Sequence, residues 1–227
     1  MRKIANVSVD LDGLAHYHSI HGLDESANPY AIYEVALPRL LDLFDELGVP
    51  ATLFVIGSDL DHTPAVKGLR KATEVGHEAA SHSYLHPYNL RQWSKLSIAE
   101  DIDRASDALL HAVGYRPAGF RTPGYNLDTR ILRLLAERGY RYDSSVLPSP
   151  PYYTAKAAVM GTMSLFGKSS GSSMVDPNSL RAPLQPYRPS RWAFWKEGDR
   201  KHSLPIWEIP IGVNRVTRVP VIGTTIG

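Results

Sequence analysis

The sequence feature that most constrains the fold is a repeated alternation of short apolar runs with longer amphipathic segments. Six runs that read as strands occupy residues 4–9, 51–57, 77–81, about 120, 140–145 and 204–212. Between them, apolar residues recur every third or fourth position and predict helices over 28–48, 63–76, 97–114 and 127–139. Strands that alternate with helices form parallel sheets, so the sequence predicts an α/β fold of the barrel type.

Local signals mark several helix ends. Asn28 precedes the first helix, Gly48 ends it, and Pro38 is expected to kink or restart it. Ser97 with Glu100 reads as a capping box for the third helix. These signals support the helices that the apolar periodicity predicts.

Composition limits the chemistry that the chain can perform. It has no cysteine, so thiolate nucleophiles and disulfides are excluded and a metal site must use His, Asp and Glu. A formal net charge of +2 lacks the positive field of a general nucleic-acid binder, so no nucleic-acid partner is expected. No apolar run approaches a membrane span, and the first residues leave no room for a signal peptide. We therefore expect a cytoplasmic protein, with peripheral membrane attachment as the alternative.

The chain is expected to form one domain over residues 1–227, with a long insertion at about 148–203. The insertion is rich in Pro, Ser, Gly and aromatic residues, and residues 151–202 carry eight Lys or Arg against three acids. A long loop over a barrel mouth could attract an anionic glycan or a phospholipid-linked sugar, or it could be a solvated face. Its aromatic residues, Trp192 and Trp195 among them, either stack on sugar rings or pack the loop down.

Two carboxylates one residue apart end the first strand. Alternate side chains of a strand share a face, so Asp10 and Asp12 should project together where the strand stops. A bound cation would offset their repulsion. The alternative is a phosphatase, because "DLDG" resembles the D-x-D-G motif of haloacid-dehalogenase-like enzymes, in which Asp10 would be the nucleophile and Asp12 the acid.

Two histidines, four residues apart, follow the third strand in "SHSYLHPY". The spacing of His82 and His86 is weak evidence alone, since the chain has nine histidines. The carboxyl ends of strands, however, are where a barrel gathers its site. One carboxylate with two imidazoles is a sound ligand set for catalytic Zn²⁺ with an open position, and it also suits Fe²⁺, Co²⁺ or Ni²⁺.

Further polar residues follow the later strands. In "GFRTPGYN", Arg121 can pair with a carboxylate, and the turn at Pro123 and Gly124 can aim backbone N–H groups at an oxyanion. Asp143 ends the next strand and either joins the site or caps the following segment. "HYHSIH", with His16, His18 and His21, reads as a polar loop, with a role near the substrate as the alternative.

Four of these motifs together resemble a known family. "VDLDG", "HSYLHP", "RTPGY" and "YDSS" are similar, in order and spacing, to the first four motifs of the polysaccharide deacetylases, the NodB-homology or carbohydrate esterase 4 family. The similarity covers residues 4 to about 147. It implies a distorted, TIM-barrel-like (β/α) barrel of about seven strands. It also implies a metal-dependent hydrolase that removes N-acetyl or N-formyl groups from an amino sugar of a polysaccharide, peptidoglycan or glycolipid.

The resemblance also implies roles for individual residues. One divalent ion, Zn²⁺ before Co²⁺, Ni²⁺ or Fe²⁺, would be held by Asp12, His82 and His86. Asp10 would be the general base, Arg121 would orient it, and a backbone N–H near Tyr125 would donate to the oxyanion. Apart from the resemblance, Asp143 is a further candidate catalytic residue, and Pro123, Trp192 and Trp195 are candidate substrate contacts. An N-acylated carbohydrate or glycolipid is the expected partner, and the oligomeric state is not predicted.

The chain departs from the family pattern in two places. Leu11 separates two acids that are usually adjacent, a variant that resembles intracellular or peptidoglycan-type members. The family's last motif supplies a histidine as general acid, but no histidine follows His202, which precedes its strand. Either the chain is truncated or the acid is lost, and we favour truncation because a full barrel of this type needs about 250 residues. A barrel that binds a glycan without turnover is the other alternative.

Overall fold

The chain forms two compact units, each of which is described by itself. The computed structural model describes residues 6–13, 16, 28, 30–165 and 174–223. The first unit comprises residues 1–86 and 100–117, and the second comprises residues 87–99 and 118–227. The single domain expected over the whole chain stays a prediction.

Three parallel strands form the sheet of the first unit. They are β1 (Val7–Asp10), β2 (Ala51–Val55) and β3 (Glu78–Ser81), with β2 in the centre. Every residue of β2 is buried, as expected for a central parallel strand with both faces covered. Asp10 is in register with Phe54, and Val55 is in register with Ser81. The carboxyl ends of the three strands therefore reach the same edge of the sheet.

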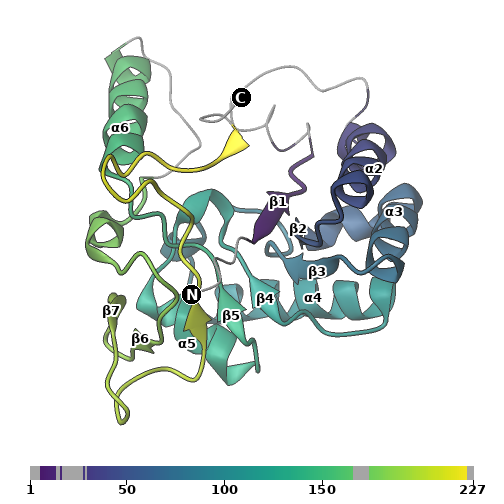
Figure 1. The fold of residues 1–227 in the computed structure, drawn as a ribbon. Coiled ribbons are helices and arrows are strands. Elements are labelled where there is room, and N and C mark those ends of the chain that lie inside the picture. Colours follow the sequence, from purple (N-terminus) through teal and green to yellow (C-terminus); the bar gives the residue numbers. More distant parts are fainter. Residues whose placement is uncertain (1–5, 14–15, 17–27, 29, 166–173, 224–227) are drawn as a thin grey trace. The chain divides into compact units, whose positions relative to one another are not determined.

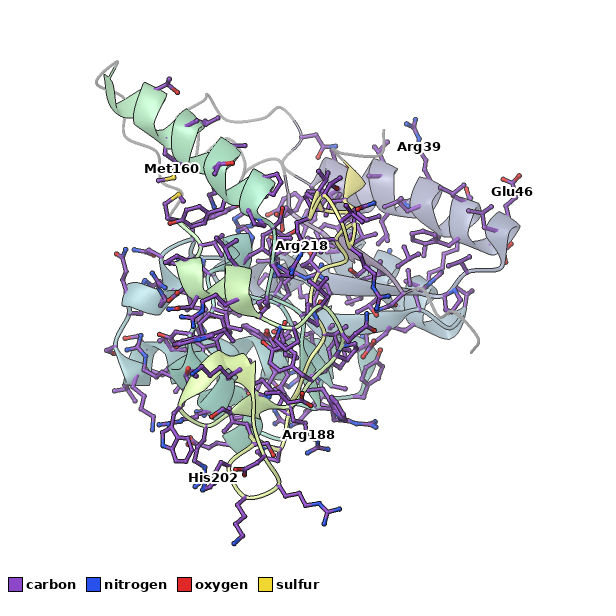
Figure 2. The ribbon with its side chains drawn as sticks, turned by 60° about the vertical axis from the view of Figure 1, so that its left-hand side comes forward. Arg39, Glu46, Met160, Arg188, His202 and Arg218 are labelled. Atoms are coloured by element: carbon purple, nitrogen blue, oxygen red, sulfur yellow. The ribbon has the colours of Figure 1, made fainter. Side chains whose placement is uncertain are left out.

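Helical segments connect these strands. In chain order they are the π-helical η1 (Ile32–Ala36), α2 (Leu37–Leu47), the 3₁₀ turn η2 (Gly57–Asp61) and α3 (Thr63–Glu74). Pro38 lies in the first turn of α2, directly after η1, and Gly48 ends α2 at φ 61°. The backbone at the junction is helical at Ala36 and Leu37, so the expected kink or restart stays a prediction. Figure 1 shows α2 beside α3, and Figure 2 shows Arg39 and Glu46 projecting from the exposed side of α2.

The core of the first unit lies between this sheet and its helices. Apolar side chains from η1, β2, β3, α2, α3 and α4 (Lys95–Val113), with Leu11 just after β1, form one buried cluster. It includes Leu11, Leu37, Leu53, Leu69 and Leu109. Such periodic apolar faces are what the sequence predicts for helices packed on a sheet. The capping box expected at Ser97 is wrong, because α4 already begins at Lys95 and the Ser94 hydroxyl accepts the Ser97 N–H at 3.1 Å.

A second set of parallel strands forms the sheet of the second unit. They are β4 (Gly119–Phe120), β5 (Tyr142–Asp143) and β8 (Trp207–Glu208), with β5 in the centre. Helix α5 (Thr129–Glu137) connects β4 to β5, and the Asp128 carboxylate caps it by accepting the Ile131 N–H at 2.8 Å. All six predicted strands are therefore confirmed, three in each unit, within an α/β fold.

The predicted insertion has more regular structure than a loop. It contains α6 (Pro150–Leu165), the 3₁₀ turn η5 (Pro177–Arg181) and an antiparallel pair, β6 (Pro189–Ser190) with β7 (Ala193–Glu197) (Figure 1). The two prolines at the start of α6 occupy the first turn, where a missing N–H costs nothing, and an alanine-rich run follows. No helix among the described residues is long and apolar enough to span a membrane.

Candidate metal centre

Asp10 and Asp12 lie where the hydrogen-bonded pairing of β1 with β2 ends. The Leu11 N–H donates to the Phe54 carbonyl at 2.9 Å, so the strand geometry continues one residue past Asp10. The Leu11 side chain is fully buried in the core, whereas Asp10 and Asp12 are both partly exposed. This alternation is what places two acids on the side of the strand opposite the core.

The two histidines lie on a tight loop directly after β3. The His82 N–H donates to the Val55 carbonyl at 2.8 Å, which anchors the start of this loop to β2. Ser83 and His86 both have positive φ, 64° and 55°, a conformation that is costly for residues other than glycine. The Ser83 hydroxyl holds the turn by accepting the His86 N–H at 3.0 Å. The loop thus keeps both imidazoles buried near Asp12.

Asp12, His82 and His86 form a cluster with the spacing of a metal-ligand set. Asp12 Oδ1 lies 3.5 Å from His82 Nε2 and 3.3 Å from His86 Nε2. Neighbouring ligand atoms of a tetrahedral site with bonds of about 2.0–2.2 Å lie roughly 3.4 Å apart. Asp12 Oδ1 is also buried and has no hydrogen-bond partner among the described residues. The three residues therefore fit a divalent cation.

The electrostatics of the cluster favour the protonation states that metal ligands need. Burial acts to raise the pKa of Asp12, but the contact with His86 and the charges of His82, His86 and His16 outweigh it and lower that pKa to about 2. Burial lowers the pKa of His86. An ionised carboxylate beside a neutral imidazole is ready to bind a cation.

Asp101 is a supporting residue that the sequence reasoning missed. It is buried on α4, and its carboxylate accepts the backbone N–H groups of Tyr84 at 2.9 Å and Leu85 at 3.0 Å. Both N–H groups belong to the loop between the two histidines. A signal was present in the sequence, because Asp101 falls on the apolar stripe of its helix, three residues after Ile98.

Arg121 and Asp143 lie together in the second unit. The buried Arg121 guanidinium donates to the Ser144 carbonyl at 2.8 Å and to the Ser144 hydroxyl at 3.0 Å, and its charge acts on Asp143. Asp143 accepts the N–H and the hydroxyl of Ser145, at 3.0 and 2.9 Å. Both side chains are thus part of one buried polar network. The pairing of Arg121 with Asp10 stays a prediction.

A second acid that the sequence reasoning missed is paired with Asp143. Glu208 is in register with Asp143 across β5 and β8, and both residues have 0% exposure. Burial raises the pKa of Asp143 to about 6, and burial with the charge of Asp143 raises that of Glu208 well above its usual range. Glu208 therefore keeps its proton, because Asp143 has the two Ser145 donors and Arg121 nearby. The signal was one acid inside the apolar run "LPIWEIPIG".

The turn expected to supply an oxyanion donor is present in the second unit. It forms the 3₁₀ turn η4 (Pro123–Tyr125), in which Gly124 and Tyr125 have φ of 62° and 61°. The Tyr125 N–H donates to the Thr122 carbonyl at 3.1 Å, within the turn itself. The roles of Pro123 and Tyr125 toward a substrate stay predictions.

The expected aromatic contacts belong to the β6–β7 hairpin. Trp192 is 63% exposed at its turn, and the partly buried Trp195 ring lies edge-on to Phe194 within β7. Their binding of a sugar stays a prediction. His202 lies in a turn after β7 (Figure 2). Its Nδ1 is 2.8 Å from Asp199 Oδ2. His18 and His21 lie outside the described residues.

Fold and site together define an α/β protein with a candidate metal centre at the carboxyl ends of parallel strands. The profile of the family described as polysaccharide deacetylase matches residues 29–142, half of the chain, and the match includes both histidines. The chain therefore belongs to the polysaccharide deacetylase family. This assignment replaces the phosphatase interpretation of "DLDG".

Individual relatives agree with this assignment. A peptidoglycan deacetylase of Helicobacter pylori is 28% identical over 152 residues, which are 64% of this chain and 50% of the relative. A chitooligosaccharide deacetylase of Bradyrhizobium sp. is 32% identical over 118 residues, 51% of this chain and 50% of the relative. The chain thus spans about half the length of these two relatives. The crystal structure of a Mycobacterium smegmatis protein assigned to the polysaccharide deacetylases matches with a TM-score of 0.63 and 24% identity, covering 91% of this chain and 58% of that one. This likeness confirms the α/β barrel-type fold.

Replacing Asp101 should destabilise the histidine loop. In Asp101→Asn one oxygen acceptor becomes a donor, so one of the two partly buried N–H groups loses its partner, at a cost of about 1–3 kcal/mol in the free energy of unfolding. Urea unfolding measures this loss. Asp107→Asn is the matched control, because Asp107 lies on the same helix in an exposed pair with Arg116 that contributes about 1 kcal/mol or less. Equal effects of the two variants would contradict the supporting role of Asp101.

The buried acid pair should make stability fall as pH rises. Because burial raises both pKa values, the folded state holds more protons than the unfolded state from about pH 4 upward through the folded pKa of Asp143, about 6. The stabilisation that the acid pair provides is complete below about pH 4 and is lost progressively as the pH rises through the folded pKa of Asp143, about 6. The free energy of unfolding of the wild type, minus that of Glu208→Gln, should therefore decline between pH 4 and pH 7.

A matched control separates this effect from general titration of the chain. Glu197 lies on β7 of the same unit and is exposed, so Glu197→Gln should show no such decline relative to the wild type. Urea unfolding at several pH values measures both differences. A flat difference for Glu208→Gln would show that the pair does not hold an extra proton.

Proposed function

We propose that this chain is a metal-dependent deacetylase that removes an N-acetyl group from an amino sugar. The observation that carries the proposal is the Asp12, His82 and His86 cluster, whose ligand atoms stand 3.3 and 3.5 Å apart as in a tetrahedral site. Zn²⁺ is the proposed ion, since one carboxylate and two imidazoles leave an open position for catalysis. Fe²⁺, Co²⁺ and Ni²⁺ accept the same ligands.

The relatives support the proposed class of substrate. One carries the name peptidoglycan deacetylase and the other chitooligosaccharide deacetylase, so both act on an acylated glycan. We therefore infer an N-acylated amino-sugar polymer as the substrate of this chain. The N-formyl group and a glycolipid substrate are finer possibilities of the same chemistry.

In the proposed reaction the two acids at the end of β1 have different roles. A bound divalent ion polarises an amide carbonyl and lowers the pKa of water. Asp12 would hold this ion, whereas Asp10, two residues earlier on the same side of the strand, would take the proton as general base. Arg121 would orient Asp10, and Asp143 would support Arg121 through the network around Ser144 and Ser145.

A barrel that binds a glycan without turnover is the second candidate. It is favoured by His202, whose ring is paired with Asp199 and lies against Trp192 at 4.8 Å between centroids. This histidine is therefore engaged within its own turn and hairpin. Turnover separates this candidate from the deacetylase.

Purified protein should contain about one transition-metal ion per chain. His82→Ala combined with His86→Ala should abolish binding, because one carboxylate remains of three ligands. Elemental analysis and titration with Zn²⁺ measure content and affinity. His111→Ala, an exposed histidine at the end of α4, is the control and should bind as the wild type does. Metal uptake that the double substitution leaves unchanged would overturn the proposed centre.

Asp10 should be needed for turnover but not for metal binding. Asp10→Asn removes the proposed base while leaving the three ligands, so acetate release from N-acetylated chitooligosaccharide or peptidoglycan should fall by about 10²–10⁴. The Zn²⁺ affinity should stay within a few fold of the wild type. A metal-loaded wild type that releases no acetate from either glycan but binds one of them would favour the non-catalytic barrel instead.

A further inference from the structure

A buried hydrogen-bonded chain runs through the first unit beside the candidate metal centre. Tyr33, from η1, donates its hydroxyl to Asp59 Oδ2 at 3.1 Å. The other oxygen of the Asp59 carboxylate, Oδ1, lies 3.2 Å from His16 Nε2. Tyr33 and Asp59 are buried, and burial followed by the charge of Asp59 raises the pKa of Tyr33, so its hydroxyl stays a donor. Both oxygens of Asp59 are therefore engaged, one of them on an imidazole.

The far end of this chain contacts a ligand of the centre. The ring of His16 lies against that of His86, with centroids 5.2 Å apart and planes at 57°. This packing is almost the same as that between the two ligands His82 and His86, at 4.8 Å and 58°. The charge of His16 also acts on Asp12. His16 thus contacts the centre, although it is not one of the three residues whose ligand atoms lie within 4.8 Å of one another.

The backbone that carries Asp59 is tied to the backbone that carries the histidines. The N–H groups of Gly57 and Ser58 donate to the carbonyls of Ser83 and Tyr84, at 2.9 and 3.0 Å. A side chain at Gly57 would place its Cβ 2.7 Å from the Tyr84 ring and 3.0 Å from the Ala105 Cα, so only glycine permits this approach. Asp59 therefore has a fixed position relative to the histidine loop.

We propose that Asp59, held by Tyr33, fixes His16 as a positioning residue that sets the orientation of the His86 ring for metal binding. The proposal rests on the metal centre of the proposed function and adds three residues to it. Outer-shell residues that orient a metal-ligating imidazole, as His16 would orient His86, typically change metal affinity 10–100-fold when they are replaced. A neighbouring His–acid pair that only stabilises the fold would change stability without changing the metal.

The test uses the full chain, with Zn²⁺ affinity measured by competition with a chromophoric chelator. His16→Ala and Asp59→Asn should each weaken Zn²⁺ binding about 10–100-fold, and Tyr33→Phe should weaken it less because Asp59 keeps its contact with His16. The visible absorption spectrum of the Co²⁺-loaded protein should shift in the same variants, because it reports the ligand geometry directly. Thermal unfolding of the metal-free variants measures any loss of stability separately.

His62 provides a matched control in the same unit. Its Nε2 lies 3.8 Å from Glu34 Oε1 and its ring stacks on Tyr30 at 3.6 Å, so it is a second His–acid pair with an aromatic partner. Its described ring contacts are with Glu34 and Tyr30 and not with a ligand of the centre. His62→Ala should therefore leave both the Zn²⁺ affinity and the Co²⁺ spectrum unchanged.

The possible results separate this inference from the proposed function. Unchanged Zn²⁺ affinity and Co²⁺ spectrum in His16→Ala and Asp59→Asn would overturn the positioning role alone. Weakened binding that His62→Ala reproduces, in proportion to lost thermal stability, would also overturn it. A metal-loaded wild type that releases no acetate would overturn the proposed activity and leave the positioning role standing, whereas a wild type that binds neither Zn²⁺ nor Co²⁺ would overturn both.

Discussion

The parallel pairing of β1, β2 and β3 is the constraint on which the candidate metal centre depends. The ladder extends one residue past each outer strand, through Leu11 to the Phe54 carbonyl and through His82 to the Val55 carbonyl. Because Leu11 is drawn into the core, Asp12 must lie on the other side of the chain. The same ladder starts the histidine loop at the same edge of the sheet. Burial of one leucine and two backbone hydrogen bonds thus bring Asp12 and His82 to the same edge without any contact specific to a metal.

The loop that carries the histidines is costly by itself, and buried acceptors offset that cost. Positive φ at Ser83 and His86 disfavours the turn, and its N–H groups would lose water on burial. Asp101 from α4 and the Ser83 hydroxyl accept these N–H groups, while the carbonyls of Ser83 and Tyr84 accept from η2. The ligands are therefore held near their binding geometry by the protein itself. This reduces the conformational entropy that is lost when an ion binds.

The pKa values of the acids shift in opposite directions in the two units. Asp12 is surrounded by imidazoles, which lower its pKa to about 2 despite burial, so the first unit holds an anion that a cation can neutralise. Asp143 and Glu208 face each other with full burial, and their pKa values rise, so the second unit holds a proton instead. The difference follows from both partners and depth, because imidazoles surround the partly exposed Asp12, whereas the carboxyl groups of Asp143 and Glu208 are fully buried beside each other.

The sequence alone determined the six strands, the four helices before residue 148 and the three candidate ligands, because periodicity and strand-end position are local properties that neighbouring residues encode. It also carried enough spacing information to identify the family. Only the tertiary structure revealed three buried acids with distant partners: Asp59, Asp101 and Glu208 accept hydrogen bonds from groups that lie 15 or more residues away in the chain. It likewise turned the expected loop after Pro150 into a helix and moved the cap of α4 to Ser94. The physical reason is that burial, pKa and hydrogen-bond partners are set by residues distant in sequence, which no local pattern reports.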